Sequence, residues 1–419
     1  MTIEADILRY VGVFNEPAGS YQVDNSGTPG DFDAFPYEEG TLDAVLGREM
    51  LDPMAGKIRL DGHDLQVLGP RACSITLASM LHSHGLDLDG DVAPPTEATW
   101  ALQRVLETVM GGSISTTNAA AQTIVVAGST TTTAVEITAT HGAGGSERFV
   151  AGGVIGCQTV AGSSNLELRE VLSVAGDIVS VKQAFSAAPI TGTPVRGGVS
   201  CYLTENPAES LQVLIEGREG TDGVVLRGLQ GGFSLTLPVG GRGQIAFALS
   251  GASWARMATS SATVPSYSNV SYLALNPLEL TVPTVGATTR VMVPQSELSI
   301  EPQIAYAPQR SGAATETIAR MKRQPARPPI QGSFLAPYED DTWYTARDNR
   351  SVHAVFAQCG NIAGSCVLIS VPTVQIVDVT PAASGEGIAG QRVTWQGRHD
   401  TAIGGATEVG YSAFRMHFV

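Results

Sequence analysis

A strict alternation of large apolar and small residues runs through residues 228–250. The large apolar positions are Phe233, Leu235, Leu237, Ile245, Phe247 and Leu249. The positions between them hold Ser234, Thr236, Ala246, Ala248 and Ser250. A period of two on both sides of a glycine-rich turn predicts an antiparallel hairpin. One face needs a core, and the other, made of small and hydroxyl side chains, is suited to water or to a partner.

A second hairpin with glycines around its turn is predicted for residues 352–371. A return strand follows around 391–395, and the last strand alternates Phe414, Met416 and Phe418 with Arg415 and His417. Two similar hairpins that supply apolar faces to one core predict a β-sandwich or partial barrel.

Helical spacing of apolar residues occurs at 74–81 and, more clearly, at about 96–110, where Thr96 can cap the start and Gly111 ends the pattern. Residues 20–56 show little periodicity and predict a long loop, with aromatic residues that would order it against a neighbour. A strand pair is expected at 57–67 and a short strand at 8–14.

The composition changes after Gly112. Residues 113–201 have few aromatic residues, are rich in Thr, Val, Ala and Gly, and contain several short alternating segments without a helix. This pattern predicts a small β-barrel or sandwich inserted into a parent domain that spans 1–112 and 202–419. The expected fold class is therefore mainly β, with one flanking helix and an inserted small β-domain.

The 419 residues include 47 glycines, 23 prolines and only 16% charged residues, which is typical of a turn-rich β protein. No apolar run reaches the length of a membrane span, and the first residues lack the order of a signal peptide. We therefore expect a soluble protein made in a cytoplasm.

The formal net charge is −15, and residues 1–100 alone contain 17 acidic against 5 basic residues. An acidic protein does not bind phosphates tightly, because affinity for nucleic acid comes mainly from cations. The acidity serves either solubility or the repulsion of a polyanion.

Catalytic motifs are missing from the sequence, so we expect no enzyme, no cofactor and no metal site. The triplet Glu339-Asp340-Asp341 is interpreted as a solvated turn rather than a cation site. His82 and His84 are expected to lie at the end of a helix rather than to bind a metal ion. Cys73, Cys157, Cys201, Cys359 and Cys366 are expected to be free buried thiols, with a Cys359–Cys366 bridge as the alternative.

The order of these parts resembles the tail tube proteins (major tail proteins) of long, non-contractile-tailed bacteriophages. The resemblance covers about 1–112 and 203–419 and rests on five features of layout. They are a Glu16-Pro-Ala-Gly19-Ser-Tyr21 start with a long loop, a helix ending in glycine, the strand from Gly228 to Leu235, the hairpin from Gly360 to Pro372, and the return from Gly385 to Trp395. The 113–201 segment resembles the small β-modules that phage tail proteins carry as insertions.

The resemblance implies hexameric rings that stack into a virion tube, assembled in the host cytoplasm, with an acidic bore through which double-stranded DNA passes without specific binding. Tape-measure, terminator and distal tail proteins would be partners, and no membrane would be involved. Candidates for the bore are Ser234, Thr236, Ala246, Ala248 and Ser250. Candidates for contacts between subunits or rings are Tyr21, Phe32, Phe35, Tyr37, Arg320, Lys322, Arg323, Phe414 and Phe418. The inserted domain would decorate the outside.

Two other classes remain open. One is another tail or virion structural protein, and the other is a glycan-binding or adhesive protein that binds a host surface through the inserted domain. The basic cluster around 320–327 is either a solvated loop or a docking patch for acidic loops of a sister subunit.

Overall fold

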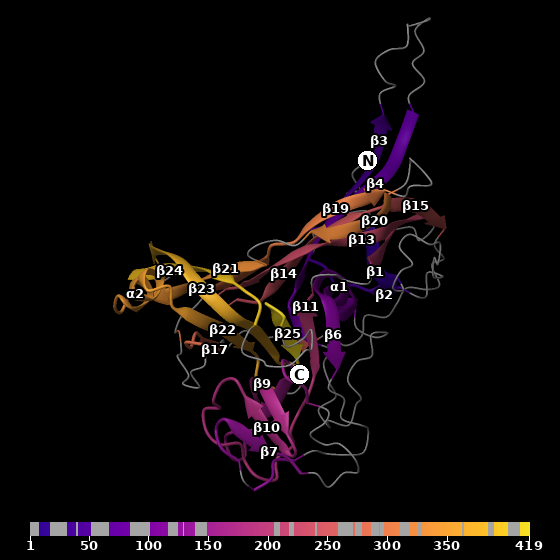
Figure 1. Ribbon diagram of the computed structural model, residues 1–419. Coiled ribbons are helices and arrows are strands. Elements are labelled where there is room, and N and C mark those ends of the chain that lie inside the picture. The colour runs from indigo at the N-terminus through magenta and orange to yellow at the C-terminus, as the bar shows by residue number, and fades with distance from the viewer. Residues whose placement is uncertain are drawn as a thin grey trace, which may run out of the picture.

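The computed structural model describes most of the chain. The described residues are 8–16, 32–38, 41–51, 67–83, 101–115, 125–128, 130–138, 149–204, 210–217, 222–238, 241–258, 271–272, 279–285, 293, 297–310, 318–324, 329–362, 364–383, 389–400 and 411–419. Within them the fold is mainly β, as the sequence predicts, with two short helices and antiparallel sheets (Figure 1).

Among the described residues, the largest sheet has 17 strands. A continuous path of antiparallel pairs crosses it in the order β3–β4–β14–β13–β18–β21–β24–β23–β22–β17. The bounds along this path are β3 (Asp43–Leu51), β4 (Val67–Met80), β14 (Gln244–Gly251), β13 (Asp222–Leu237), β18 (Leu298–Pro302), β21 (Ile330–Pro337), β24 (Ala389–Gly397), β23 (Val367–Ala383), β22 (Val352–Cys359) and β17 (Glu279–Thr281).

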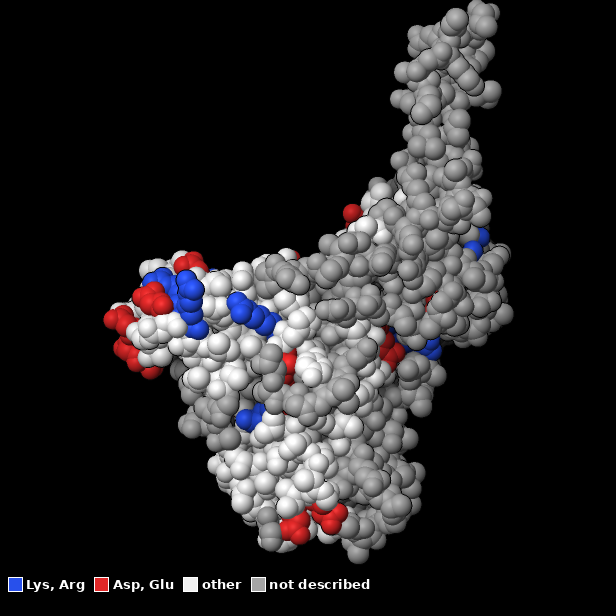
Figure 2. Space-filling model, in the orientation of Figure 1, with Lys and Arg blue, Asp and Glu red and all other residues white. Residues whose placement is uncertain are grey.

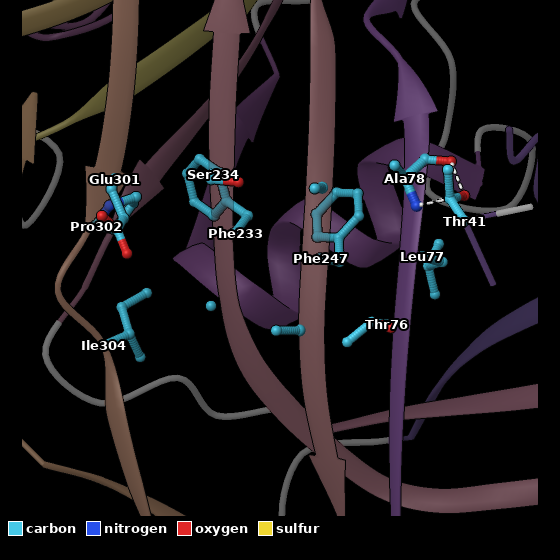
Figure 3. A pocket seen from close by; sticks show the side chains of 13 residues that line it. Thr41, Thr76, Leu77, Ala78, Phe233, Ser234, Phe247, Glu301, Pro302 and Ile304 are labelled. Carbon is cyan, nitrogen blue, oxygen red and sulfur yellow. Dashed lines mark hydrogen bonds between the residues drawn. The ribbon is translucent and has the colours of Figure 1, made fainter. Parts of the chain in front are cut away.

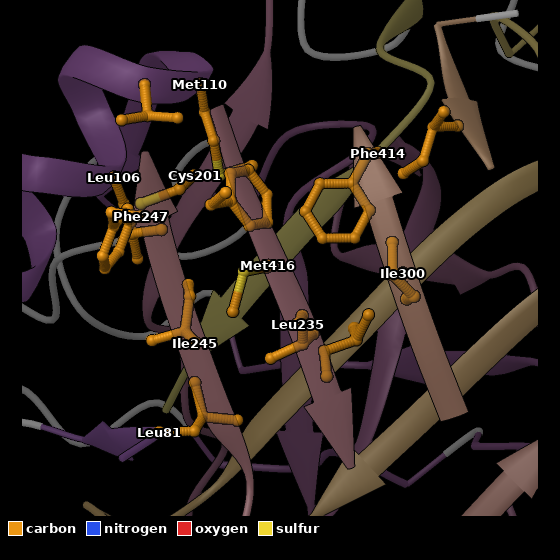
Figure 4. Packing of buried hydrophobic residues seen from close by; sticks show 14 of the residues in the cluster. Leu81, Leu106, Met110, Cys201, Leu235, Ile245, Phe247, Ile300, Phe414 and Met416 are labelled. Carbon is orange, nitrogen blue, oxygen red and sulfur yellow. The ribbon is translucent and has the colours of Figure 1, made fainter. Parts of the chain in front are cut away.

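Further strands join this path at β13 and at β23. The strands around β13 are β1 (Leu8–Glu16), β2 (Asp33–Ala34), β12 (Ser210–Gly217) and β15 (Ser253–Ala258), and those that lead from β23 are β25 (Arg415–Phe418), β11 (Val199–Leu203) and β6 (Gly111–Ser115). The helix α1 (Ala101–Met110) packs against β1, β11, β12 and β13. Its apolar stripe and the large residues of β13 and β14 meet in one core (Figure 4).

Strand β13 changes partners at Gly228. Its first half pairs with β12 and β15, and its second half pairs with β14 and β18. Gly228 has a φ of 63°, a left-handed conformation that costs glycine little and other residues much more. Its N–H donates to the buried Glu16 carboxylate at 3.1 Å. The bend lets one strand serve two layers of the fold.

The segment between β6 and β11 forms a separate sheet of four strands. They are β7 (Ala134–Glu136), β10 (Ile178–Val181), β9 (Glu167–Ala175) and β8 (Val154–Cys157), in the order β7–β10–β9–β8. This sheet has a core of its own that includes Val135, Val179 and Phe185. Because β6 and β11 pair with each other and lie in the large sheet, the inserted part runs over 116–198, shorter than the 113–201 expected.

The inserted sheet is joined to the large sheet by an apolar contact and by a buried cluster of charges. Leu166 and Leu168 pack against Phe356 and Leu368. Beside them the Gln358 side chain accepts from the Leu168 N–H and donates to the Leu166 carbonyl, both at 2.8 Å. This joint fixes the inserted sheet to the hairpin of β22 and β23.

The charged part of the joint is centred on Glu170 of β9. Its carboxylate accepts from Arg415 of β25 at 2.6 Å and from Lys182 at 2.7 Å. Asp400 contacts the same two cations, so two carboxylates meet two cations inside the protein. Burial would raise the pKa of Glu170, but the adjacent Arg415 and Lys182 hold it at about 2.

His417 lies next to this cluster and is also fully buried. Its Nδ1 shares a hydrogen bond of 2.8 Å with the Ser200 hydroxyl. Burial lowers the pKa of His417 to about 3, since the nearby Glu170 raises it less than desolvation lowers it. The ring is therefore neutral at physiological pH.

Two small sheets and a short helix complete the described fold. They are β5 (His82–Ser83) with β16 (Ser271–Tyr272), β19 (Ala305–Arg310) with β20 (Ile318–Gln324), and α2 (Thr342–Asp348). The β19–β20 hairpin packs against β13, and α2 packs against β23.

Both predicted hairpins are confirmed, with Phe233 opposite Phe247 in the first and Phe356 opposite Ser370 in the second. The helix expected at 74–81 is wrong, because β4 occupies this segment and pairs on both sides. The loop expected at 20–56 contains β3 over Asp43–Leu51. The strand pair at 57–67 lies outside the described residues except for Val67, which begins β4, and α1 is described from Ala101 onward.

All five cysteines are free and buried, so the bridge between Cys359 and Cys366 is excluded and the free-thiol interpretation is confirmed. His82 does not end a helix. It lies in β5, and its Nδ1–H donates to the Met80 carbonyl at 2.8 Å. His84 lies outside the described residues.

Candidate functional site: the small-residue face

The five residues proposed from the sequence for a bore lie together on one face of β13 and β14. Ser234, Ala248 and Ser250 are exposed, while Thr236 and Ala246 are half-buried. Ser234 lies directly opposite Ala246 across the two strands. The large residues between them point the other way, into the core. The alternation in the sequence therefore separates the two faces as expected.

This face continues onto strands that are distant in the sequence. Ala246 is paired with Ala78 of β4, and Ala248 with Thr76. In the other direction, cross-strand pairs link Thr236 to Ser299, Ser299 to Ser333, and Ser333 to Thr394. Directly paired residues share a face of a sheet. We call these residues, with the five above, the small-residue face.

Sequence reasoning missed the members of the small-residue face outside the first hairpin. A signal was present, because Ser299 stands between two buried apolar residues and Thr394 between Val393 and Trp395. The alternation shows which residues face away from the core, but the sequence does not show that these strands become neighbours.

The small-residue face is hollowed where β4, β14, β13 and β18 pass side by side (Figure 3). The groove has a volume of about 480 Å³. Its lining includes Thr41, Thr76, Ala78, Ser234, Ala246, Ala248, Glu301, Pro302 and Ile304. Thr41 fixes one wall, since its hydroxyl accepts from the Ala78 N–H at 3.1 Å and donates to the Glu38 carbonyl at 2.7 Å.

The lining offers hydroxyl groups, the Glu301 carboxylate and apolar groups, among them those of Leu77, Phe233 and Phe247. The lining contains no cysteine and no histidine. Such a surface can guide or exclude a partner.

Charges on the small-residue face are sparse and mostly acidic. Asp43 pairs with Thr76, and Asp378 pairs with Thr394. Arg392 donates to the Ser333 hydroxyl at 3.2 Å and lies 3.6 Å from the Glu297 carboxylate. Most acids of residues 1–100 lie outside the described residues, so the acidic bore stays a prediction.

Four of the aromatic residues proposed for contacts between subunits are buried in the chain's own core. Phe32 packs 5.8 Å from Phe14, and Phe35 packs 6.1 Å from Phe247. Phe414 and Phe418 belong to the main core. These four side chains are at most 5% exposed and have almost no surface to offer a neighbour, so the prediction was wrong for them.

The remaining predicted contact residues are placed differently. Tyr37 is half-buried against the main core, and Tyr21 lies outside the described residues. Arg320, Lys322 and Arg323 lie on β20, which makes this segment a strand rather than a loop.

In the described part of the chain, no group of three or more His, Cys, Asp or Glu is placed to hold a metal ion. Neither α1 nor α2 has the length and apolar character to cross a membrane, and no other helix is described. No family model matches the sequence, and no curated protein matches it.

Proposed function

We propose that this chain is a structural subunit of a virion tail tube, whose copies close into hexameric rings that stack around a channel for DNA. The inserted sheet lies away from the channel, and the small-residue face lines it. The observation that carries the proposal is the continuity of this face across strands that are distant in the sequence.

The form of the sheet supports assembly from repeated copies. Among the described residues, β3 pairs with β4 and leaves its other side without a strand. The exposed Val45 lies on this strand. An edge strand with apolar residues favours pairing with another chain, and closure into a ring removes such edges.

The chemistry of the small-residue face suits a surface past which DNA moves. Favourable contacts to phosphates come mainly from Lys and Arg, and every such contact would retard movement. The face presents Ser, Thr and Ala with scattered carboxylates, and its Arg392 is engaged by Glu297. Small side chains also leave few obstacles.

Electron microscopy of the purified protein tests the proposal. We expect rings or tubes with a central hole, and virions that contain the chain in their tails. A chain that stays monomeric under all assembly conditions and is missing from virions would overturn the proposal.

A matched pair of variants tests the role of the small-residue face. Ala248→Lys is expected to let assembled tubes retain double-stranded DNA at low salt, whereas Ala248→Gln, of similar size, is not. Because counterion release makes the Lys contacts salt-dependent, the retention should disappear as salt rises. Equal DNA retention by both variants would show that Ala248 does not line the channel.

A further inference from the structure

A second groove lies at the end of the large sheet that carries α2. It has a volume of about 470 Å³ and is lined by Tyr338, Asp341, Tyr344, Pro381, Ala389 and Gly390. The Tyr338 hydroxyl donates to the Asp341 carboxylate at 3.0 Å, and the Tyr338 side chain is otherwise largely exposed. Two phenol rings and a carboxylate therefore border an apolar floor. We call this the tyrosine groove.

The rim of the tyrosine groove is acidic. Glu339, Asp340 and Asp341 are exposed, and Figure 2 shows acidic side chains at this end of the molecule, with basic side chains beside them. Arg347 lies nearby, but it pairs with Asp348 at 2.9 Å and its guanidinium lies 5.4 Å from the centre of the Tyr344 ring. Residues 338–350 hold four acids and two arginines, so this end carries a net negative charge.

A segment of complementary charge lies on β20, over Ile318–Gln324. It contains Arg320, Lys322 and Arg323 and no acidic residue. In Figure 1, α2 lies at one end of the large sheet, whereas β20 lies against β13 toward the other end. The two features are therefore placed to meet between copies rather than within one chain.

We infer that the tyrosine groove receives β20 of a neighbouring copy, in a head-to-tail contact that repeats around the ring. The inference rests on the proposed function, and it names the surfaces that bring subunits together. A contact between two different surfaces generates a closed ring when the rotation between copies closes.

The chemistry of the tyrosine groove matches such an occupant. Lys and Arg are attracted to the faces of phenol rings, and they form charge-assisted hydrogen bonds with carboxylates. Complementary charge also sets the orientation of approach and disfavours contacts between two acidic ends.

Charge reversal on each side tests the contact. One variant carries Glu339→Lys and Asp341→Lys, and it leaves Asp340 intact because its carboxylate accepts from the Thr342 N–H at 2.9 Å. The other carries Arg320→Glu and Lys322→Glu. The control is Asp177→Lys, which reverses an exposed acid on the inserted sheet. Thermal unfolding of each monomer checks that it is folded.

Each variant alone is expected to lose assembly by about tenfold or more in sedimentation and electron microscopy, which corresponds to about 1.4 kcal/mol. An equimolar mixture should recover assembly, since reversed grooves then meet reversed strands in alternation. The control should assemble like the wild type.

If the wild type forms rings and either variant also assembles normally by itself, the proposed contact is wrong. The same follows if the mixture of the two variants does not recover assembly. Both results leave the proposed function standing. A wild-type chain that stays monomeric would overturn both.

Discussion

Strands β14 and β25 have the same alternating sequence pattern and opposite surroundings. In β14 the small residues between Ile245, Phe247 and Leu249 face outward. In β25 the residues that alternate with Met416 and Phe418 are Arg415 and His417, and both are fully buried. Period two shows which residues share a face, but it does not show whether that face is free. A second sheet can cover a polar face if it brings charges that match.

The largest effect is expected from breaking the charged joint that covers β25. Arg415→Ala leaves Glu170 and Asp400 with Lys182 as their one remaining cation in the cluster. Removing one partner of a buried ion pair costs about 3–5 kcal/mol, because a charge stays buried without compensation. Urea unfolding should show this loss.

The control for this prediction is Arg347→Ala, which removes an exposed pair with Asp348 and should cost less than about 1 kcal/mol. Equal losses in the two variants would mean that the joint contributes no more than a surface ion pair.

The two faces of β14 are compared by substituting adjacent residues. Phe247 is 1% exposed and packs against Phe35 and Phe233, so Phe247→Ala should lower the free energy of unfolding by about 3–4 kcal/mol. Its neighbour Ala248 faces outward, and Ala248→Ser should change it by less than about 0.5 kcal/mol. Similar losses of unfolding free energy at both positions would show that the outward face of β14 is covered within the monomer.

The smallest of these effects concerns pH. The pKa of His417 is about 3 in the folded chain and near its ordinary 6.5 when unfolded, so the unfolded chain binds the proton first. Stability is therefore full above pH 6.5 and falls as the pH drops toward 3. Between pH 6.5 and 5 the loss is about 2 kcal/mol.

Glu170 adds a second loss at lower pH. Its pKa of about 2 lies below the ordinary 4.5, so its contribution is present above pH 4.5 and is lost toward pH 2. Urea unfolding at pH 7, 5.5, 4 and 3 measures both losses. His82 and His353 contribute to the same decline, because burial lowers their pKa as well. His417→Gln should therefore reduce the decline between pH 6.5 and 5, and an unchanged decline would assign it to the other histidines.

The fold was predictable where the local alternation of residues was sufficient to determine which strands pair. The hairpins of β13 with β14 and of β22 with β23 follow from local alternation and glycine-rich turns. The prediction of a helix at 74–81 was wrong because the spacing of Ile75, Leu77 and Leu81 fits both a helix and a strand. The segment forms a strand because it pairs with β3 on one side and with β14 on the other. Tertiary pairing overrides local propensity in such segments.

The candidate site was predictable in part for a similar reason. The outward residues of β13 and β14 are visible in the sequence, whereas Ser299, Ser333 and Thr394 join them only through strand order. Phe35 is predicted to contact a neighbouring subunit because it lies among small and polar residues in a segment without periodicity, and Phe414 because it lies on the last strand. The sequence does not show that the chain's own sheets close over them.

The five buried thiols give the protein internal reporters of its own opening. Burial raises the pKa of Cys73 and Cys359 to about 12, so neither is a reactive thiolate in the folded chain at neutral pH. Cys157 lies in the inserted sheet and Cys201 in the large one. The order in which an alkylating reagent reaches them would tell whether the two sheets open together or one after the other.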